Sequence, residues 1–278
     1  MSTATLAPSS APPELQTFLE EARIAVDREL DRRLAVPADD PGRLAEAMHY
    51  AATGPGKRLR PAMLIAAAEA CGATREAALP AAAAIEMLHA YTLVHDDLPA
   101  MDDDDERRGR PTVHIKFGEA IAILAGDGLL TAAFGTLAEI GPRGAAAAVA
   151  VLARRAGVSE LLGGQAIDLT TPREKLTTLA AIERLHAAKT GALFAAAAEL
   201  GGIVAGVSAA TCDALGRYGM AIGIAFQHAD DRDDAELVEH AGDAARRMRE
   251  LCEDARTLIR PLRAPILDGF AAWISSRA

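Results

Sequence analysis

Two clusters of aspartate residues carry the clearest chemical signal in this sequence. The first starts at Asp96, and seven of the eleven residues from Asp96 to Glu106 are acidic. The second contains Asp230 and Asp234, which share one face of a helix because they are four residues apart. Carboxylates crowded in this way repel one another and need cations to neutralise them. Since all the donors are oxygen atoms, the clusters predict a Mg²⁺ site rather than a zinc or copper site.

Two such clusters indicate more than either cluster alone. A single acidic run is most simply interpreted as a solvated surface. Both clusters here are flanked by apolar, helix-forming sequence, which favours a site inside the fold. Mg²⁺ typically takes one or two protein carboxylates and completes its shell with water and substrate phosphate. Two clusters on opposite sides of a cavity could therefore hold a diphosphate through shared metal ions.

Basic residues accompany the acidic ones. Three lie in a loop rich in glycine and proline, and three directly follow the first acidic cluster: Lys57, Arg58 and Arg60, then Arg107, Arg108 and Arg110. Arginine binds phosphate through two parallel hydrogen bonds, and lysine binds it as a point charge. Charge pairing on a surface turn would explain either group by itself. Beside the aspartates, the two groups predict a site for a metal-bridged diphosphate.

The elements that position these residues are predicted to be helices. Aromatic residues make up only 4% of the 278 residues, and alanine, the strongest helix former, is abundant. Glycine and proline divide the chain into segments of about 10 to 25 residues, which suit helices better than strands. We expect a disordered tail over residues 1–12 and a single all-α domain over residues 13–278. The alanine-rich stretches 145–153 and 192–198 are predicted to be central helices.

Composition also limits the location and the partners of the protein. A formal net charge of −10 argues against binding to nucleic acid. The three cysteines, Cys71, Cys212 and Cys252, are far apart, which predicts a reducing compartment and no disulfide framework. The sequence has neither a secretory signal pattern nor an uninterrupted apolar stretch of about 18 residues. We therefore expect a cytoplasmic protein without a membrane span.

Five segments resemble, in order, the motifs of the trans-prenyl diphosphate synthase family: GKRLRP (56–61), MLHAYTLVHDDLPAMDDDDERRGRPTVH (87–114), GGQAIDL (163–169), HAAKTGALF (186–194) and IGIAFQHADD (222–231). They are most similar to the motifs of bacterial farnesyl diphosphate synthases. The resemblance covers roughly residues 45 to 234 and is most specific in the second segment. It implies a helical bundle around a deep central cavity (the isoprenoid synthase type), usually in a homodimer.

The resemblance also implies an activity, the Mg²⁺-dependent head-to-tail condensation of isopentenyl diphosphate with an allylic diphosphate, dimethylallyl or geranyl. In this family three Mg²⁺ ions bind with the allylic diphosphate. By motif position the metal ligands would be Asp96, Asp102 and Asp230, with Asp97, Asp231 and Asp234 close by. The released diphosphate is expected to accept the proton, so no side-chain base is needed. We therefore interpret the histidines beside the motifs as structural: His95, His114, His186 and His228.

The remaining roles follow from the same motif positions. Arg107 and Lys189 would bind the allylic diphosphate. Isopentenyl diphosphate would be bound by four residues, Lys57, Arg60, His89 and Arg108. Thr190 and Gln227 would line the reacting centre.

Product length in this family depends on the side chains just before the first aspartate motif. Here Tyr91 and Thr92 lie five and four residues before Asp96. A ring at Tyr91 is expected to close the cavity beneath a growing chain, which predicts the fifteen-carbon farnesyl diphosphate. Geranylgeranyl diphosphate is the alternative, and Tyr91 could equally be a plain core aromatic.

The sequence departs from the family pattern after Asp234. The family normally continues with a loop whose lysine is a further ligand of the allylic diphosphate, but this chain has no lysine after Lys189. Either Arg232 or an arginine of the stretch 246–249 replaces it, or the protein is a weakened or inactive paralogue that binds isoprenoid diphosphates. A third interpretation is a terpene cyclase, which needs neither Lys57 nor His89, and a fourth is a purely structural helical protein.

Overall fold

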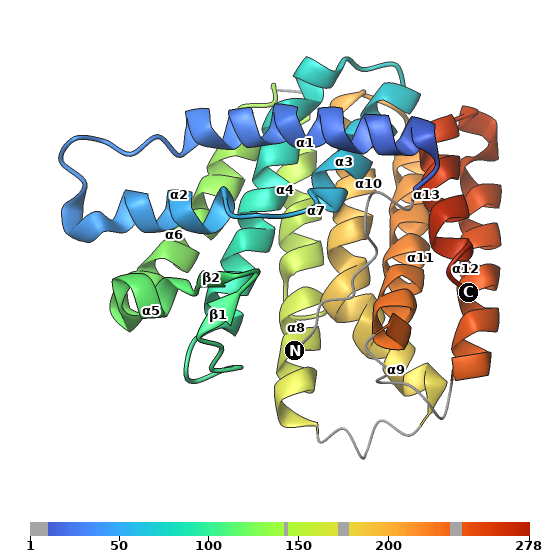
Figure 1. Cartoon of the computed structure of the whole chain (residues 1–278). Helices are drawn as coiled ribbons and strands as arrows, with labels where there is room; N and C mark the ends of the chain where they lie inside the picture. The colour runs from blue at the N-terminus through green and yellow to red at the C-terminus, as the bar shows by residue number, and fades with distance from the viewer. Residues whose placement is uncertain (1–10, 142–143, 172–177, 234–240) are drawn as a thin grey trace.

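The structure is a computed structural model that describes residues 11–141, 144–171, 178–233 and 241–278. Most of it is helical, which confirms the predicted all-α class (Figure 1). Their bounds are α1 Pro13–Arg33, α2 Leu44–Ala52, α3 Leu59–Ala70, α4 Arg75–Asp96, α5 Val113–Phe117, α6 Glu119–Ala138, α7 Ala145–Ala156, α8 Leu161–Thr170, α9 Leu179–His186, α10 Ala192–Val204, α11 Ala209–Asp233, α12 Ala241–Ile259 and α13 Pro265–Ser275. Most of the predicted tail, residues 1–12, lies outside the described residues.

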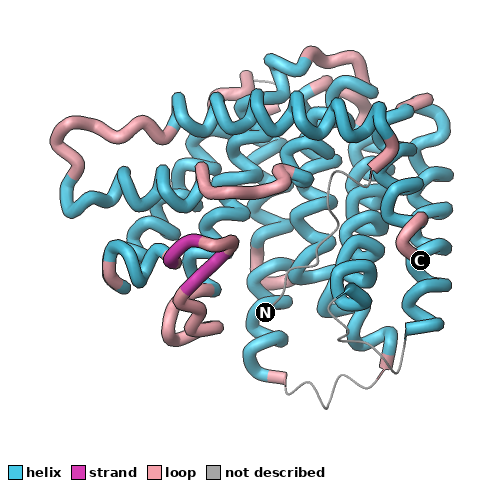
Figure 2. Tube along the Cα trace, viewed as in Figure 1, coloured by secondary structure: helices cyan, strands magenta, loops and turns pink. Residues whose placement is uncertain are grey.

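One short hairpin interrupts the helices in the described part of the chain. Its strands, β1 (Glu106–Arg107) and β2 (Arg110–Pro111), pair antiparallel (magenta in Figure 2). The turn between them is Arg108–Gly109, and both residues have positive φ angles of 55° and 76°. The hairpin directly follows the first acidic cluster, so it brings Arg107 and Arg108 back beside the end of α4.

The centre of the bundle is α10, which packs against α3, α4 and α11. Every residue from Ala192 to Gly202 is buried, so the predicted central position of the stretch 192–198 is confirmed. Small side chains allow the helix axes to come close together. At Gly219 of α11, for example, a Cβ atom would clash with the carbonyl oxygen of Phe194 in α10. Figure 1 shows α1 running crosswise to these central helices and α12 and α13 beside α11.

The prediction for the other alanine-rich stretch, 145–153, was wrong. It forms α7, which buries only Ala148, Val151, Leu152 and Ala156. The remaining alanines of α7 are partly or fully exposed. Alanine has little apolar area to hide and favours helix in any environment, so a run of alanines alone does not distinguish a central helix from a peripheral one.

Two long helices place the aspartate clusters. Thr74 caps the start of α4 by accepting a hydrogen bond from the backbone N–H of Ala77. The helix then runs for 22 residues and ends at Asp96, just before Pro99. On the other side of α10, α11 runs for 25 residues and carries Asp230 in its last turn. Both motifs therefore sit at the ends of core helices.

Among the described residues, three continuous helical segments are long and apolar enough to cross a membrane by length and composition alone: Arg75–Asp96, Glu119–Ala138 and Leu179–Val204, the last of which spans α9 and α10. Their apolar stretches are interrupted by polar residues, so a search for unbroken runs does not find them. The first and third are mostly buried in the bundle, and α6 buries one face against α4. Helix packing thus accounts for much of their apolar character.

Candidate active site

A cavity of about 470 Å³ lies among α3, α4, α6, α8 and α10. Seven of the residues predicted from the sequence line it: Arg60, His89, Tyr91, Thr92, Asp96, Lys189 and Thr190. Its other lining is largely apolar and includes Leu98, Met101, Ile123, Leu161, Leu162 and Leu193. The cavity lining therefore combines polar groups, among them Asp96 and Lys189, with a largely apolar wall.

The first aspartate motif folds back on itself at the end of α4. The backbone N–H of Asp102 donates to the carbonyl oxygen of Asp96 at 2.9 Å. Asp102 is exposed, whereas Asp96 is half-buried at the cavity. Burial raises the pKa of Asp96 to about 6, although Lys189 lies close by and acts in the opposite direction. The carboxyl group of Asp96 thus lacks a full complement of positive charge from the protein.

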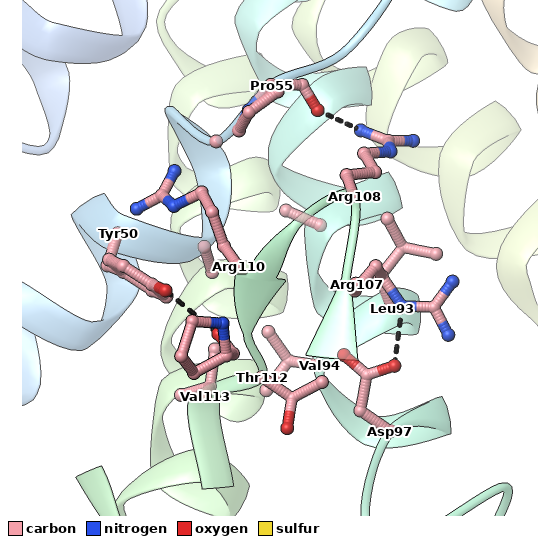
Figure 3. A pocket seen from close by; sticks show the side chains of 14 residues that line it. Tyr50, Pro55, Leu93, Val94, Asp97, Arg107, Arg108, Arg110, Thr112 and Val113 are labelled. Atoms are coloured by element: carbon pink, nitrogen blue, oxygen red, sulfur yellow. Dashed lines mark hydrogen bonds and ion pairs between the residues drawn. The ribbon is translucent and has the colours of Figure 1, made fainter. Parts of the chain in front are cut away.

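Asp97 has a different environment from its neighbour. It is buried, and the Nε of Arg107 donates to its Oδ1 at 2.5 Å (Figure 3). Burial raises the pKa of Asp97, which Arg107 partly counteracts. Asp97 points away from the 470 Å³ cavity into a smaller pocket under the hairpin, lined also by Arg108 and Pro55. It therefore acts on Arg107 rather than at the cavity.

The second motif repeats this arrangement. Nε2 of His186 lies 2.9 Å from Oδ2 of Asp231, and Nε2 of Gln227 donates to Oδ1 of Asp231 at 2.8 Å. Burial, the largest single effect, raises the pKa of Asp231, but the hydrogen bonds from His186 and Gln227 and the electrostatic interactions with His186 and His228 together outweigh it, and the pKa is lowered. Gln227 also accepts a hydrogen bond from the hydroxyl of Thr190 at 2.9 Å. Asp234 lies outside the described residues.

The donor set fits Mg²⁺. The predicted ligands Asp96, Asp102 and Asp230 offer only carboxylate oxygens, and burial leaves Asp96 short of compensating charge. Within the described ranges, no three acidic, histidine or cysteine side chains already converge as a metal cage would require. Mg²⁺ suits such an open arrangement, because it completes its shell with water and substrate oxygens.

Lys189 lies in a single π-helical turn, Ala187–Gly191, between α9 and α10. Such turns are rare and occur often at functional sites. The Nζ of Lys189 contacts Oδ2 of Asp168 in α8 at 2.5 Å. Sequence reasoning assigned no role to Asp168, although it lies in the GGQAIDL segment; its spacing from Lys189 gives no hint that the two meet.

The cations predicted to bind isopentenyl diphosphate gather at the start of α3. Burial lowers the pKa of Arg60 to about 10. Burial and then Arg60 lower the pKa of His89, so its ring is neutral and Nε2 can accept from Nη1 of Arg60 at 3.3 Å. Arg108 reaches across from the hairpin to the carbonyl oxygen of Pro55 at 2.7 Å, in the same loop as Lys57 (Figure 3). Burial is also the main cause of the lowered pKa of Arg108.

Arg58 does not belong with these cations. It is buried and makes ion pairs with Glu86 at 2.7 Å and Asp27 at 2.8 Å. It also donates to the carbonyl oxygen of Gly54 at 2.8 Å. All of its charge is thus used within the protein, and its part in the GKRLRP segment is to hold the loop.

Tyr91 and Thr92 line the cavity one turn before Asp96. Tyr91 is buried, and its ring meets the ring of His95 edge to face at 5.0 Å. Nε2 of His95 lies 3.1 Å from the carbonyl oxygen of Ile123 in α6. The hydroxyl of Thr92 donates to the carbonyl oxygen of His89, so its hydrogen bond is made within α4. Sequence reasoning missed the wall formed by Ile123, Leu161 and Leu162, because no local pattern shows which apolar residues face a cavity.

Comparison with known proteins agrees with this geometry. A family model described as Polyprenyl synthetase matches residues 41–256. The chain is 41% identical over 253 residues to a farnesyl diphosphate synthase of Escherichia coli (strain K12), covering 81% of this chain and 84% of the relative. It is also 41% identical over 221 residues to a geranylgeranyl diphosphate synthase of Cyanophora paradoxa, covering 78% of this chain and 73% of the relative.

Solved structures give the same result. An FPP/GFPP synthase from Zymomonas mobilis matches with a TM-score of 0.86 and 39% identity, covering 94% of this chain and 99% of that one. A geranyltransferase from Legionella pneumophila matches with a TM-score of 0.84 and 29% identity, covering 95% of this chain and 97% of that one. Because the family model and the relatives span most of the chain, the protein belongs to the polyprenyl synthetase family and is a prenyltransferase.

Proposed function

We propose that this prenyltransferase makes farnesyl diphosphate by Mg²⁺-dependent head-to-tail condensation of isopentenyl diphosphate with dimethylallyl or geranyl diphosphate. The observation that carries the proposal is the cavity, with the polar groups of Asp96 and Lys189 and the buried ring of Tyr91 in its lining. Farnesyl and geranylgeranyl diphosphate synthases both occur among the relatives. The choice of fifteen carbons rests on Tyr91, whose ring restricts the space for a longer chain.

The charges of the protein suit the reaction. Arg107 and Lys189 would bind the allylic diphosphate and stabilise the negative charge that develops as it leaves. Mg²⁺ held by Asp96, Asp102 and Asp230, with three ions expected from the family, would add further neutralisation of that charge. The apolar wall encloses the hydrocarbon chain and keeps water from the allylic cation.

The second substrate would bind beside the first. Lys57, Arg60 and Arg108 supply positive charge for isopentenyl diphosphate, and neutral His89 adds a polar contact without further charge. Thr190, whose hydroxyl is held by Gln227, lines the same cavity. The departing diphosphate would take the proton lost after the new bond forms, so no side chain has to act as a base.

We further propose that the protein is a cytoplasmic homodimer. Apolar side chains of α6 and α8 that are about half exposed support the dimer: Ile123, Leu124, Leu162, Ile167 and Leu169. Two of them, Ile123 in α6 and Leu162 in α8, also line the cavity, so these exposed apolar side chains extend to its wall. A second copy would cover these side chains, and light scattering of the purified protein would show twice the mass of one chain.

The activity is tested by incubating labelled isopentenyl diphosphate with dimethylallyl or geranyl diphosphate, with and without Mg²⁺, and sizing the products. A fifteen-carbon product formed only with Mg²⁺ supports the proposal. A twenty-carbon product would favour a geranylgeranyl diphosphate synthase. Binding of both diphosphates without any product would identify an inactive paralogue.

A further inference from the structure

The last described turn of α11 carries the second aspartate motif, and two chains of polar contacts hold it. One chain faces the cavity and the other faces the final helices. The first joins Thr190, Gln227, Asp231 and His186, as described above. The second starts at His228, three residues before Asp231 on the same helix, and none of the cavity-lining residues belongs to it.

His228 is almost completely buried, with 1% of its surface exposed. Its Nε2 lies 3.3 Å from Oε1 of Glu183 in α9. The same oxygen accepts a hydrogen bond from Nε of Arg247 in α12 at 3.0 Å. The rings of His228 and His186 meet edge to face at 4.9 Å, so the two chains touch. A continuous path of contacts therefore leads from Arg247 to Asp231.

Arg247 is the last residue of this path and belongs to α12. This helix lies after Asp234, where the sequence departs from the family pattern. Arg247 lines neither the cavity nor the pocket under the hairpin. Its Nε pairs with Glu183, whose side chain is 19% exposed, and its Nη1 lies 3.4 Å from Oε2 of Glu250 in the same helix. Among the described residues, Arg247 and His228 both contact Oε1 of Glu183, Arg247 from α12 and His228 from α11. Arg247 thus compensates a carboxylate directly behind the metal-binding motif.

We propose that Arg247 is a positioning residue for the second aspartate motif. Through Glu183 and His228 it fixes the last turn of α11, so that Asp230 presents its carboxylate to diphosphate-bound Mg²⁺. The inference rests on the proposed function and deepens it. If an arginine of 246–249 replaced the missing lysine, it would contact the allylic diphosphate directly. The present inference instead gives Arg247 an indirect role through Glu183 and His228. Residues behind the ligands of a metal site typically change metal affinity by about 10- to 100-fold.

The test is calorimetric titration of the full-length protein with inorganic diphosphate in saturating Mg²⁺, which needs no turnover. Arg247→Met removes the charge and keeps the length of the side chain. We expect its dissociation constant for Mg²⁺–diphosphate to rise about tenfold. Arg247→Lys restores a cation at the same place and is expected to recover most of the affinity. Steady-state kinetics should then show a higher Mg²⁺ requirement in Arg247→Met with little change in the KM for isopentenyl diphosphate.

Arg246→Met is the matched control. Arg246 is the preceding residue of α12, is exposed, and pairs within its own helix with Asp243 at 2.8 Å. Its affinity should stay within about twofold of the wild type. Glu183→Gln combined with Arg247→Met should be no worse than Arg247→Met alone, because both act on one path.

The outcomes separate this inference from the proposed function. Equal affinities of wild type, Arg247→Met and Arg246→Met would overturn the positioning role and leave the synthase proposal intact. A wild type that does not bind Mg²⁺–diphosphate would overturn both. If Arg247→Met lowers the melting temperature, the affinities are compared at a temperature where all the variants are folded. Loss of affinity in both Arg247→Met and Arg247→Lys would then contradict a role for the charge.

Discussion

Arg107 donates from Nε to Oδ1 of Asp97 at 2.5 Å, so the second aspartate of the first motif holds the arginine expected to bind the allylic diphosphate. Residues 98–106 separate the two, and the turn after α4 brings Arg107, the second residue of β1, back to Asp97. Asp231 has a comparable partner in His186. In both motifs, then, the second aspartate is engaged by a neighbouring side chain, which favours a role in positioning that side chain.

Replacing Asp97 by Asn should separate positioning from metal binding. The amide keeps the shape but loses the charge that holds Arg107, and a hydrogen bond to a charged group is worth about 1.5–3 kcal/mol. We expect the KM for the allylic diphosphate to rise by about tenfold or more. Asp104→Asn is the control, because Asp104 is about half exposed and contacts the same arginine at 3.2 Å. Equal changes in the two variants, measured by steady-state kinetics, would contradict the role of Asp97.

Tyr91→Ala should lengthen the product. Removing a buried ring from the cavity wall makes room for further five-carbon units, so products of twenty carbons or more should appear on chromatography. Tyr91→Phe keeps the ring and should still stop at fifteen. A Tyr91→Ala enzyme that makes only the fifteen-carbon product would show that another part of the wall ends the chain.

Arg58→Met should destabilise the protein strongly without involving a substrate. It leaves Glu86 and Asp27 without their guanidinium partner, and removing one member of a buried ion pair costs about 3–5 kcal/mol. Urea unfolding would measure the loss. Arg32→Gln, which removes an exposed pair with Glu29 on α1, should leave the free energy of unfolding nearly unchanged. A small effect at Arg58 would mean that the loop relaxes around the change.

His89 should make the folded protein lose stability in acid. Its pKa is lowered in the folded state by burial and by Arg60, so the unfolded chain binds a proton first as the pH falls below about 6.5. Stability contributed by the neutral ring is therefore complete above that pH and is lost below it. His89→Gln should reduce the difference in unfolding free energy between pH 7.5 and 5.5 by about 1 kcal/mol. An unchanged difference would show that His89 titrates normally.

The sequence predicts the helices and their ends because these depend on neighbouring residues. Pro99 ends α4 after Asp96, and the four-residue spacings are visible without a structure. Partner choice is different. The contact of Arg58 with Glu86 joins residues 28 positions apart, and that of Arg247 with Glu183 joins residues 64 positions apart. Such pairs depend on how helices pack, so the sequence does not show that Arg58, unlike the basic residues next to it, belongs to the core.

The π-helical turn Ala187–Gly191 has a consequence for the changes in length that the chain can tolerate. It holds one residue more per turn than a regular helix, and removing one residue would restore the regular helix. Everything before the deletion would then rotate by about 100° relative to α10. His186 would leave Asp231, while Thr190 would keep its place beside Gln227. Over evolutionary time this segment can therefore accept substitutions far more readily than the insertion or deletion of a residue.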